Sequence, residues 1–245
     1  PPAVIDGTTA VAFRKDLAAD KNLEQLTREG IFSDCRKITG SKQSLTDDDF
    51  FLKELHSSEK WPAFLQTAVE KKRTIVICGE TGSGKTVLTR ALLKSLHKDE
   101  RVIILEDVHE VTVDHVVEAV YMMYGDAGKI GRVSATDALR ACMRLTPGRI
   151  IMTELRDDAA WDYLKALNTG HPGGVMSTHA NSARDAFNRI GLLIKATPIG
   201  RMLDMSDIMR MLYSTIDVVV HMEKRKIKEI YFDPEYKMQC VNGSL

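Results

Sequence analysis

The eight residues from Gly79 to Thr86 read Gly-Glu-Thr-Gly-Ser-Gly-Lys-Thr, a complete G-x-x-x-x-G-K-[ST] phosphate-binding loop. The preceding residues 74–78 form a short β-branched, apolar run that predicts a buried strand, and residues 87–96 carry apolar side chains at helical spacing. Phosphate binding needs this order of strand, glycine-rich turn and helix, because backbone N–H groups and the positive end of the helix then converge on the anion. The chain is therefore predicted to contain a nucleotide-binding α/β domain.

Within this loop, Lys85 is expected to bridge the outer phosphates and the Thr86 hydroxyl to ligate Mg²⁺. A chance glycine-rich turn is the alternative, and the two flanking elements argue against it. The residues expected to bind the nucleotide are Gly79, Glu80, Thr81, Gly82, Ser83, Gly84, Lys85, Thr86 and Val87.

Composition excludes several other classes of protein. The 34 basic and 34 acidic residues cancel, so no overall field draws this chain of 245 residues to nucleic acid or to an anionic membrane. Four scattered cysteines without a C-x-x-C pair argue against a zinc ribbon or a disulfide framework and favour a reducing cytosol. No apolar run is long enough to span a membrane, and no export signal is recognised. The start at Pro1-Pro2 suggests a fragment.

The chain is expected to divide into three parts. Residues 1–14 include a loosely alternating stretch that predicts one or two strands, residues 15–45 are interpreted as a linker containing a short helix, and residues 46–245 form the main domain. Thr46 is expected to cap a helix reaching about residue 56, followed by a helix at about 62–71. Strands are then predicted at 74–78, 102–106, 116–122, 149–153, 174–178, 216–222 and 227–232, and helices at 85–96, 135–145, 157–168, 182–195 and 205–213. This alternation predicts a mostly parallel sheet with helices on both faces.

Carboxylates follow two of the predicted strands, at the sheet edge where such folds bind ligands. Glu106 and Asp107 end the strand at 102–106, and Glu110 follows them, so this cluster could orient an attacking water. Glu154 ends the strand at 149–153 and resembles the acid that holds Mg²⁺ in a Walker B element. A solvated acidic turn remains the alternative for the first cluster, and the division of roles between Glu110 and Glu154 stays open.

Two histidines, His171 and His179, flank the strand predicted at 174–178. Taken alone, each is better explained as a packed or solvent-facing side chain, and no third ligand lies at a recognisable metal-binding spacing. Phosphoryl-transfer sites in assemblies often use an arginine from a neighbouring subunit. The candidates for that role are Arg14, Arg101, Arg132, Arg140 and Arg144.

Four boxes of residues together resemble the hexameric traffic ATPases of type IV secretion and conjugation systems, the VirB11-like group of the secretion ATPase superfamily. They are the Walker A loop at 79–86, an Asp box at 105–110, a Walker B element at 150–156 and a His box at 170–182. The resemblance extends over nearly the whole chain. It implies a RecA-like P-loop NTPase domain with a mostly parallel sheet, preceded by a linker and the end of an N-terminal domain.

The resemblance also implies roles for single residues. Glu110 matches the acid that polarises water, Glu154 the acid associated with Mg²⁺, and His179 a sensor of the γ-phosphate. Arg14 matches a linker-proximal arginine that approaches the phosphates, and Arg140 and Arg144 lie where a ring interface is plausible. The implied catalytic set is thus Lys85, Glu110, Glu154 and His179, with Mg²⁺ held by Thr86 and Glu154.

At the level of function, the resemblance implies a Mg-ATP-hydrolysing motor that powers pilus or channel assembly and substrate translocation. The implied partners are five further copies of the chain, other secretion-system ATPases and inner-membrane channel components, with a cytoplasmic location that leaves peripheral membrane association open. The alternatives are a motor of type II secretion or type IV pili and a RecA-like nucleic-acid translocase. The absence of C-x-x-C weighs against the tetracysteine-bearing assembly motors, and the balanced charge against direct nucleic-acid binding.

Overall fold

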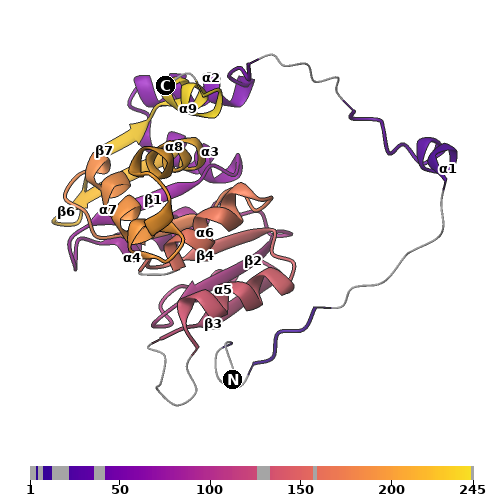
Figure 1. Cartoon of the computed structure of the whole chain (residues 1–245). Coiled ribbons are helices and arrows are strands. Elements are labelled where there is room, and N and C mark those ends of the chain that lie inside the picture. The colour runs from indigo at the N-terminus through magenta and orange to yellow at the C-terminus, as the bar shows by residue number, and fades with distance from the viewer. Residues whose placement is uncertain are drawn as a thin grey trace.

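The computed structural model describes Val4 and residues 8–12, 22–35, 42–125, 133–156 and 159–243. Within this part of the chain, seven strands form one sheet in the order β3-β2-β4-β5-β1-β6-β7 (Figure 1). All neighbouring strands are parallel except β6 and β7, which form an antiparallel hairpin at one edge. The strands are β1 (Ile75–Gly79), β2 (Arg101–Glu106), β3 (Glu118–Met123), β4 (Arg149–Met152), β5 (Val175–Thr178), β6 (Val218–Glu223) and β7 (Lys226–Phe232).

Helices cover both faces of the sheet, as the alternating sequence pattern predicts. Successive strand residues point to opposite faces, so Ile77 packs into one core and its neighbour Cys78 into the other. The first core is closed by α2 (Asp47–Ser57), α3 (Trp61–Glu70) and α4 (Lys85–Leu93). The second is closed by α5 (Ala135–Arg144), α6 (Ala159–Asn168), α7 (Ala183–Ala196) and α8 (Met205–Thr215).

The predicted helix start at Thr46 is confirmed. The Thr46 hydroxyl accepts a hydrogen bond from the Asp49 backbone N–H, and the Asp49 carboxylate accepts one from the Thr46 backbone N–H. This reciprocal capping box satisfies two N–H groups that have no partner inside the helix. The helix that begins with the phosphate loop is shorter than predicted and ends at Leu93.

Three details differ from the sequence prediction. Residues 8–12 contain no regular secondary structure, and Val4 forms only a single antiparallel bridge with Met122 on the edge strand β3, so the described residues do not form the strands predicted before residue 14. A strand needs a neighbouring strand to pair with its backbone N–H and C=O groups. Among the described residues before position 14, only Val4 forms such a pair. Near the C-terminus, the structure contains a helix that was not predicted, α9 (Pro234–Val241), and this helix packs on α8. A 3₁₀ turn also forms at Gly200–Met202.

The segment that the sequence predicts to be a linker contains the predicted short helix, α1 (Leu23–Arg28), none of whose residues is buried. No helix among the described residues combines the length and the apolar character needed to cross a bilayer.

A buried ion pair lies at the edge where the parallel strands begin, opposite the phosphate loop. The Arg149 guanidinium is fully buried at the start of β4, where it donates to both carboxylate oxygens of Glu100 at 2.9 and 3.1 Å and to the carbonyl of Val69. Desolvation of Glu100 opposes its ionisation, but the hydrogen bonds and charge of Arg149 prevail and lower the pKa of Glu100.

Candidate functional site

The phosphate loop joins β1 to α4 and depends on glycine at three positions. Gly79, Gly82 and Gly84 have φ values of 151°, 77° and 98°, in the left-handed region that glycine adopts without a steric penalty. At Gly79 there is also no room for a side chain, because a Cβ atom would lie 2.2 Å from the carbonyl oxygen of Met222 on β6. The loop is therefore a turn at the carboxyl edge of the sheet whose backbone conformation requires glycine.

Lys85 begins α4 and folds back over this turn. Its Nζ donates to the carbonyl oxygens of Gly79 and Glu80, both at 2.9 Å. Burial lowers the pKa of Lys85, while the nearby Glu154 carboxylate acts in the opposite direction. In the middle of the loop, the Ser83 Oγ is buried and has no hydrogen-bond partner among the described residues. The loop thus holds one ammonium group bonded to backbone carbonyls and one hydroxyl that has no partner among the described residues.

Glu154 follows β4, two strands away from the loop, and its side chain is 18 % exposed. It accepts a hydrogen bond from Arg156, and its Oε1 lies 3.2 Å from the Nε2 of His179, which follows β5. Burial favours the neutral acid, yet the hydrogen bonds and charges of Arg156 and His179 outweigh it and lower the pKa of Glu154. Glu154 is therefore an ionised carboxylate at neutral pH.

Arg156 connects Glu154 to the neighbouring loop after β2. Its guanidinium lies 3.3 Å from the carboxylate of Asp107, and the paired carboxylates raise the pKa of Arg156. The Tyr124 hydroxyl, at the end of β3, donates to the backbone carbonyl of Glu154 at 2.8 Å. Residues that follow β3 and β5 thus contact Glu154 directly, and Asp107 after β2 pairs with its partner Arg156.

The predicted acidic cluster at 106–110 is divided in the structure. Glu106 is fully buried and accepts hydrogen bonds from the backbone N–H groups of Glu110 and Val111, at 3.1 and 3.0 Å, and its Oε2 lies 2.9 Å from the Nδ1 of His109. Its carboxylate is used to hold the turn and is not exposed to water. Glu110 is exposed, and its backbone carbonyl accepts a hydrogen bond from Arg90 on α4.

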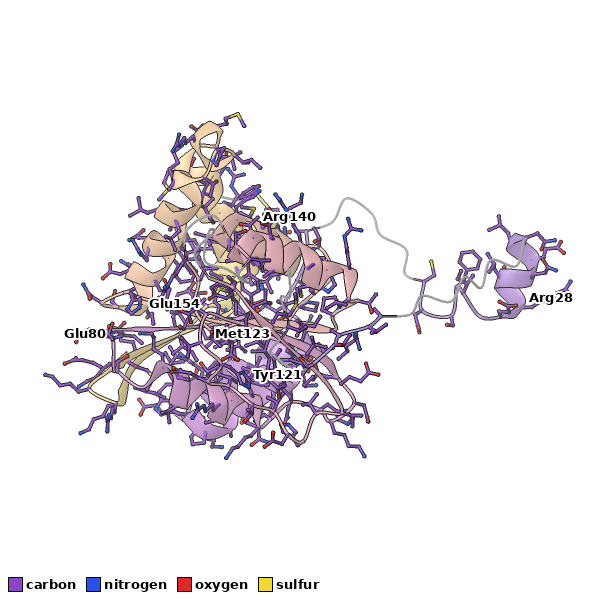
Figure 2. The ribbon with its side chains drawn as sticks, turned by 90° about the horizontal axis from the view of Figure 1, so that it is seen from below. Arg28, Glu80, Tyr121, Met123, Arg140 and Glu154 are labelled. Carbon is purple, nitrogen blue, oxygen red and sulfur yellow. The ribbon has the colours of Figure 1, made fainter. Side chains whose placement is uncertain are left out.

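The predicted catalytic residues are thus only partly brought together. Lys85, Glu154 and His179 share the carboxyl edge at β1, β4 and β5, and Figure 2 shows Glu80 of the loop and Glu154 on the same side of the molecule. Within the part of the chain that the structure describes, the Glu110 carboxylate makes no hydrogen bond or ion pair with these three residues.

The remaining histidine and arginine candidates lie elsewhere. His171 precedes β5 at the opposite edge, where its Nδ1 lies 2.9 Å from the carbonyl oxygen of Pro147. Arg101 is used in packing, because its side chain donates to the Leu145 carbonyl and pairs with Glu118. Arg144 is exposed at the end of α5. Arg14 and Arg132 lie outside the described residues.

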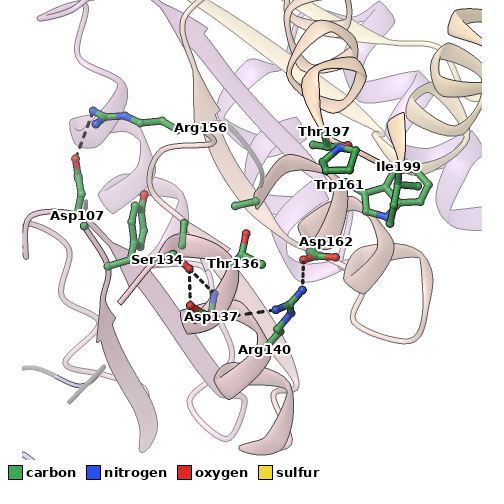
Figure 3. A pocket seen from close by; sticks show the side chains of 15 residues that line it. Asp107, Ser134, Thr136, Asp137, Arg140, Arg156, Trp161, Asp162, Thr197 and Ile199 are labelled. Atoms are coloured by element: carbon green, nitrogen blue, oxygen red, sulfur yellow. Dashed lines mark hydrogen bonds and ion pairs between the residues drawn. The ribbon is translucent and has the colours of Figure 1, made fainter. Parts of the chain in front are cut away.

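A groove of about 660 Å³ opens next to Arg156, and no residue of the phosphate loop lines it (Figure 3). Arg140 lines it and lies 3.6 Å from Asp137 and 3.9 Å from Asp162, so its charge is already balanced. Apolar side chains of Trp161 and Ile199 form part of the opposite wall. This mixture of charges fits a triphosphate poorly, and the phosphate loop remains the better candidate site.

The sequence did not predict the supporting roles of two residues. Glu106 holds the turn that follows β2, and Arg156 pairs with Glu154. The position of Glu106 at the end of an apolar strand predicts a catalytic candidate. A buried carboxylate is costly unless it is hydrogen-bonded, however, and Glu106 is hydrogen-bonded within its own turn. Arg156 stands two residues after Glu154, a spacing that signals a local ion pair and could have been used.

Comparisons with known proteins identify the family. The family described as "Type II/IV secretion system protein" matches residues 41–229. The type IV secretion system protein VirB11 of Brucella suis is 36% identical over 247 residues, covering 97% of this chain and 68% of that protein. The chain belongs to the VirB11-like type IV secretion ATPases.

Two further comparisons agree with this assignment. PtlH of Bordetella pertussis, also a type IV secretion system protein, is 36% identical over 92% of this chain and 66% of its own length. The crystal structure of the Brucella suis VirB11 ATPase in complex with sulphate superposes with a TM-score of 0.85 at 34% identity, covering 93% of this chain and 67% of that one. The pilus retraction motor PilT, at 22% identity and a TM-score of 0.52, shares the fold alone. The sequence-based prediction of a type IV secretion ATPase is confirmed.

Proposed function

We propose that this secretion ATPase binds Mg-ATP at residues 79–87 and hydrolyses it with Lys85, Glu154, His179 and Glu110. The observation that carries the proposal is the convergence of Lys85, Glu154 and His179 at one sheet edge, beside a glycine-rich turn. Lys85 would exchange its two backbone carbonyl partners for phosphate oxygens, and the orphan Ser83 hydroxyl supports an anionic occupant of the turn.

The metal would be held by Thr86, at the start of α4, and by Glu154. Mg²⁺ is usually held by one or two protein ligands together with substrate phosphates and water, and a hydroxyl with one carboxylate would match that pattern. When bound, Mg²⁺ neutralises charge that develops on the phosphates.

The two acids would have different roles. The lowered pKa of Glu154 makes it a weak proton acceptor, which favours cation binding over activation of water. Glu110 would then position the attacking water. Its loop is tied by Arg90 to α4, the helix that begins at the phosphate loop.

In the assembled system, we infer that hydrolysis drives a ring of six subunits that supports channel or pilus assembly and substrate transfer. Residues 46–245 would be the motor domain, 15–45 the linker and 1–14 the end of an N-terminal domain, and Arg14 would approach the phosphates. Arg140 and Arg144 are candidates for the subunit boundary. The proposed partners are other secretion-system ATPases and inner-membrane channel components on the cytoplasmic side, without direct nucleic-acid binding.

The first test is Lys85→Ala. This variant is expected to lose ATP hydrolysis, because the β- and γ-phosphates lose their counter-charge. Steady-state phosphate release measures the effect, and undiminished turnover would remove the phosphate loop from the mechanism. Single-stranded DNA is expected not to stimulate the wild-type rate; strong, salt-dependent stimulation would instead support a nucleic-acid translocase.

The second test separates the two acids. Glu110→Gln is expected to retain binding of Mg-ATP and to stop hydrolysis, whereas Glu154→Gln is expected to weaken the dependence of binding on Mg²⁺. Binding is measured with and without Mg²⁺ for both variants. If only Glu154→Gln combines normal Mg-ATP binding with lost turnover, the water-positioning role moves to Glu154.

A further inference from the structure

The order of strands orients any nucleotide held by the phosphate loop. Along the carboxyl edge, Glu154 follows β4, His179 follows β5, the loop follows β1, and the turn of the β6–β7 hairpin follows β6. If the γ-phosphate faces Glu154 and His179, as proposed above, the rest of a linear triphosphate must extend away from them. The α-phosphate, ribose and base would then leave the loop on the β6 side.

The β6–β7 turn lies directly against the loop on that side. A Cβ atom at Gly84 would lie 3.7 Å from the Cα and 3.9 Å from the Cβ of Arg225, and 3.3 Å from the terminal methyl group of Met222. Gly79 also pairs with Met222 across the two parallel strands. Figure 1 shows β6 and β7 running side by side at the edge of the sheet next to β1. The hairpin turn is therefore part of the wall of the phosphate loop.

The turn has a defined and costly backbone conformation. Its two central residues, Lys224 and Arg225, have φ values of 49° and 63°, where glycine or asparagine is usual. The pairing register between β6 and β7 also shifts at His221 and Met222, an irregularity that strengthens local twist. Such strain persists only where the surroundings fix the conformation, and it is concentrated at functional sites.

The two central residues of the turn are both cations, and among the described residues only one of them forms an ion pair. Lys224 lies 3.2 Å from the Glu223 carboxylate. Arg225 is exposed and makes no ion pair within the described residues. Its planar, weakly hydrated guanidinium is suited to stacking on an aromatic ring, which a lysine ammonium does less well.

We propose that Arg225 forms the nucleoside side of the nucleotide site and stacks its guanidinium on the purine of bound ATP or ADP. This inference rests on the proposed function, because it needs a triphosphate in the loop with its γ-phosphate toward Glu154. It assigns the β6–β7 turn a binding role that the motifs in the sequence do not indicate.

The test compares Arg225→Gly with the wild type in titrations of ADP and of inorganic tripolyphosphate, which lacks a nucleoside. Glycine suits a positive φ, so this variant removes the side chain without straining the turn. The dissociation constant for ADP is expected to rise roughly three- to thirtyfold, with that for tripolyphosphate unchanged. Arg225→Lys is expected to recover only part of the loss.

The controls separate this inference from the proposed function. Lys98→Ala removes an exposed cation from the loop before β2, at the opposite edge, and is expected to leave ADP binding unchanged. Unchanged ADP binding by Arg225→Gly would overturn the inference, as would an equal loss for ADP and tripolyphosphate, which would place Arg225 on the phosphates. Retention of tripolyphosphate by Lys85→Ala would contradict the proposed function instead, whatever the outcome for Arg225.

Discussion

The Nε2 of His179 lies 3.2 Å from the Oε1 of Glu154, which joins an imidazole after β5 to a carboxylate after β4. The two residues are 25 positions apart in the chain and meet because their strands are neighbours in the sheet. This contact places the proposed sensor of the γ-phosphate next to the proposed Mg²⁺ ligand. A substitution of either residue should therefore alter the position of the other side chain.

His179→Ala is expected to lower kcat for ATP hydrolysis by roughly a hundredfold, the usual cost of removing one preorganised donor from a developing charge. ADP has no γ-phosphate, so its affinity should change little. Steady-state turnover and ADP titration check both parts. His171→Ala is the matched control, because His171 lies at the opposite edge beside Pro147 and should leave turnover unchanged. An equal effect of the two substitutions would contradict a sensor role for His179.

Arg156→Gln is expected to reduce the free energy of unfolding at pH 7 and to have a progressively smaller effect in acid. In the wild type the folded-state pKa of Glu154 is below the ordinary 4.5, so its ionisation stabilises the fold above that pH. This contribution disappears as the pH falls from 4.5 through the lowered pKa, because the unfolded state takes up its proton first. In the variant, the pKa of Glu154 moves back toward 4.5.

Chemical denaturation from pH 7 to well below pH 4.5 measures this difference, because the contribution of Glu154 is lost in that acid range. The same substitution in a Glu154→Gln background provides the control, since the Glu154 carboxylate is then absent and only the pair with Asp107 remains. An effect that persists in the control background would show that Arg156 acts mainly through Asp107. An effect that is constant across the pH range would contradict a role for either carboxylate.

Arg149→Ala is expected to lower the free energy of unfolding by about 3–5 kcal/mol, because it leaves Glu100 largely buried without its main partner. Arg210→Ala, which removes an exposed pair with Asp207 on α8, should cost less than about 1 kcal/mol. Urea denaturation compares the two. A loss below about 1 kcal/mol for Arg149→Ala would mean that the fold tolerates the unpaired carboxylate.

Iodoacetamide is expected to modify Cys35 well before Cys78 or Cys142. Cys35 is exposed, whereas burial raises the pKa of the Cys78 and Cys142 thiols to about 12 and leaves almost no reactive thiolate. Mass spectrometry of partly labelled protein gives the order, and Cys35→Ser should remove the fast phase. Early labelling of Cys78 would indicate that β1 opens next to the phosphate loop.

Local signals in the sequence predicted much of the fold. The phosphate loop, the cap at Thr46 and all seven strands are short-range patterns, so they could be recognised from neighbouring residues. α9 was missed, although the Pro234 that begins it is a usual residue at a first helical position. The strands expected before residue 14 were also wrong for residues 8–12, since strand formation depends on a distant partner and not on the segment itself.

For the site, the sequence by itself determined the chemistry of the candidates: a glycine-rich loop, Lys85, and acids and a histidine at strand ends. Only the tertiary structure decided which of them lie together. The strand order is not the chain order, so it joins Glu154 to His179, buries Glu106 as a support for its turn, and brings Arg225 beside Gly84 from 141 residues later. These contacts depend on long-range packing and on desolvation, which no local pattern of residues encodes.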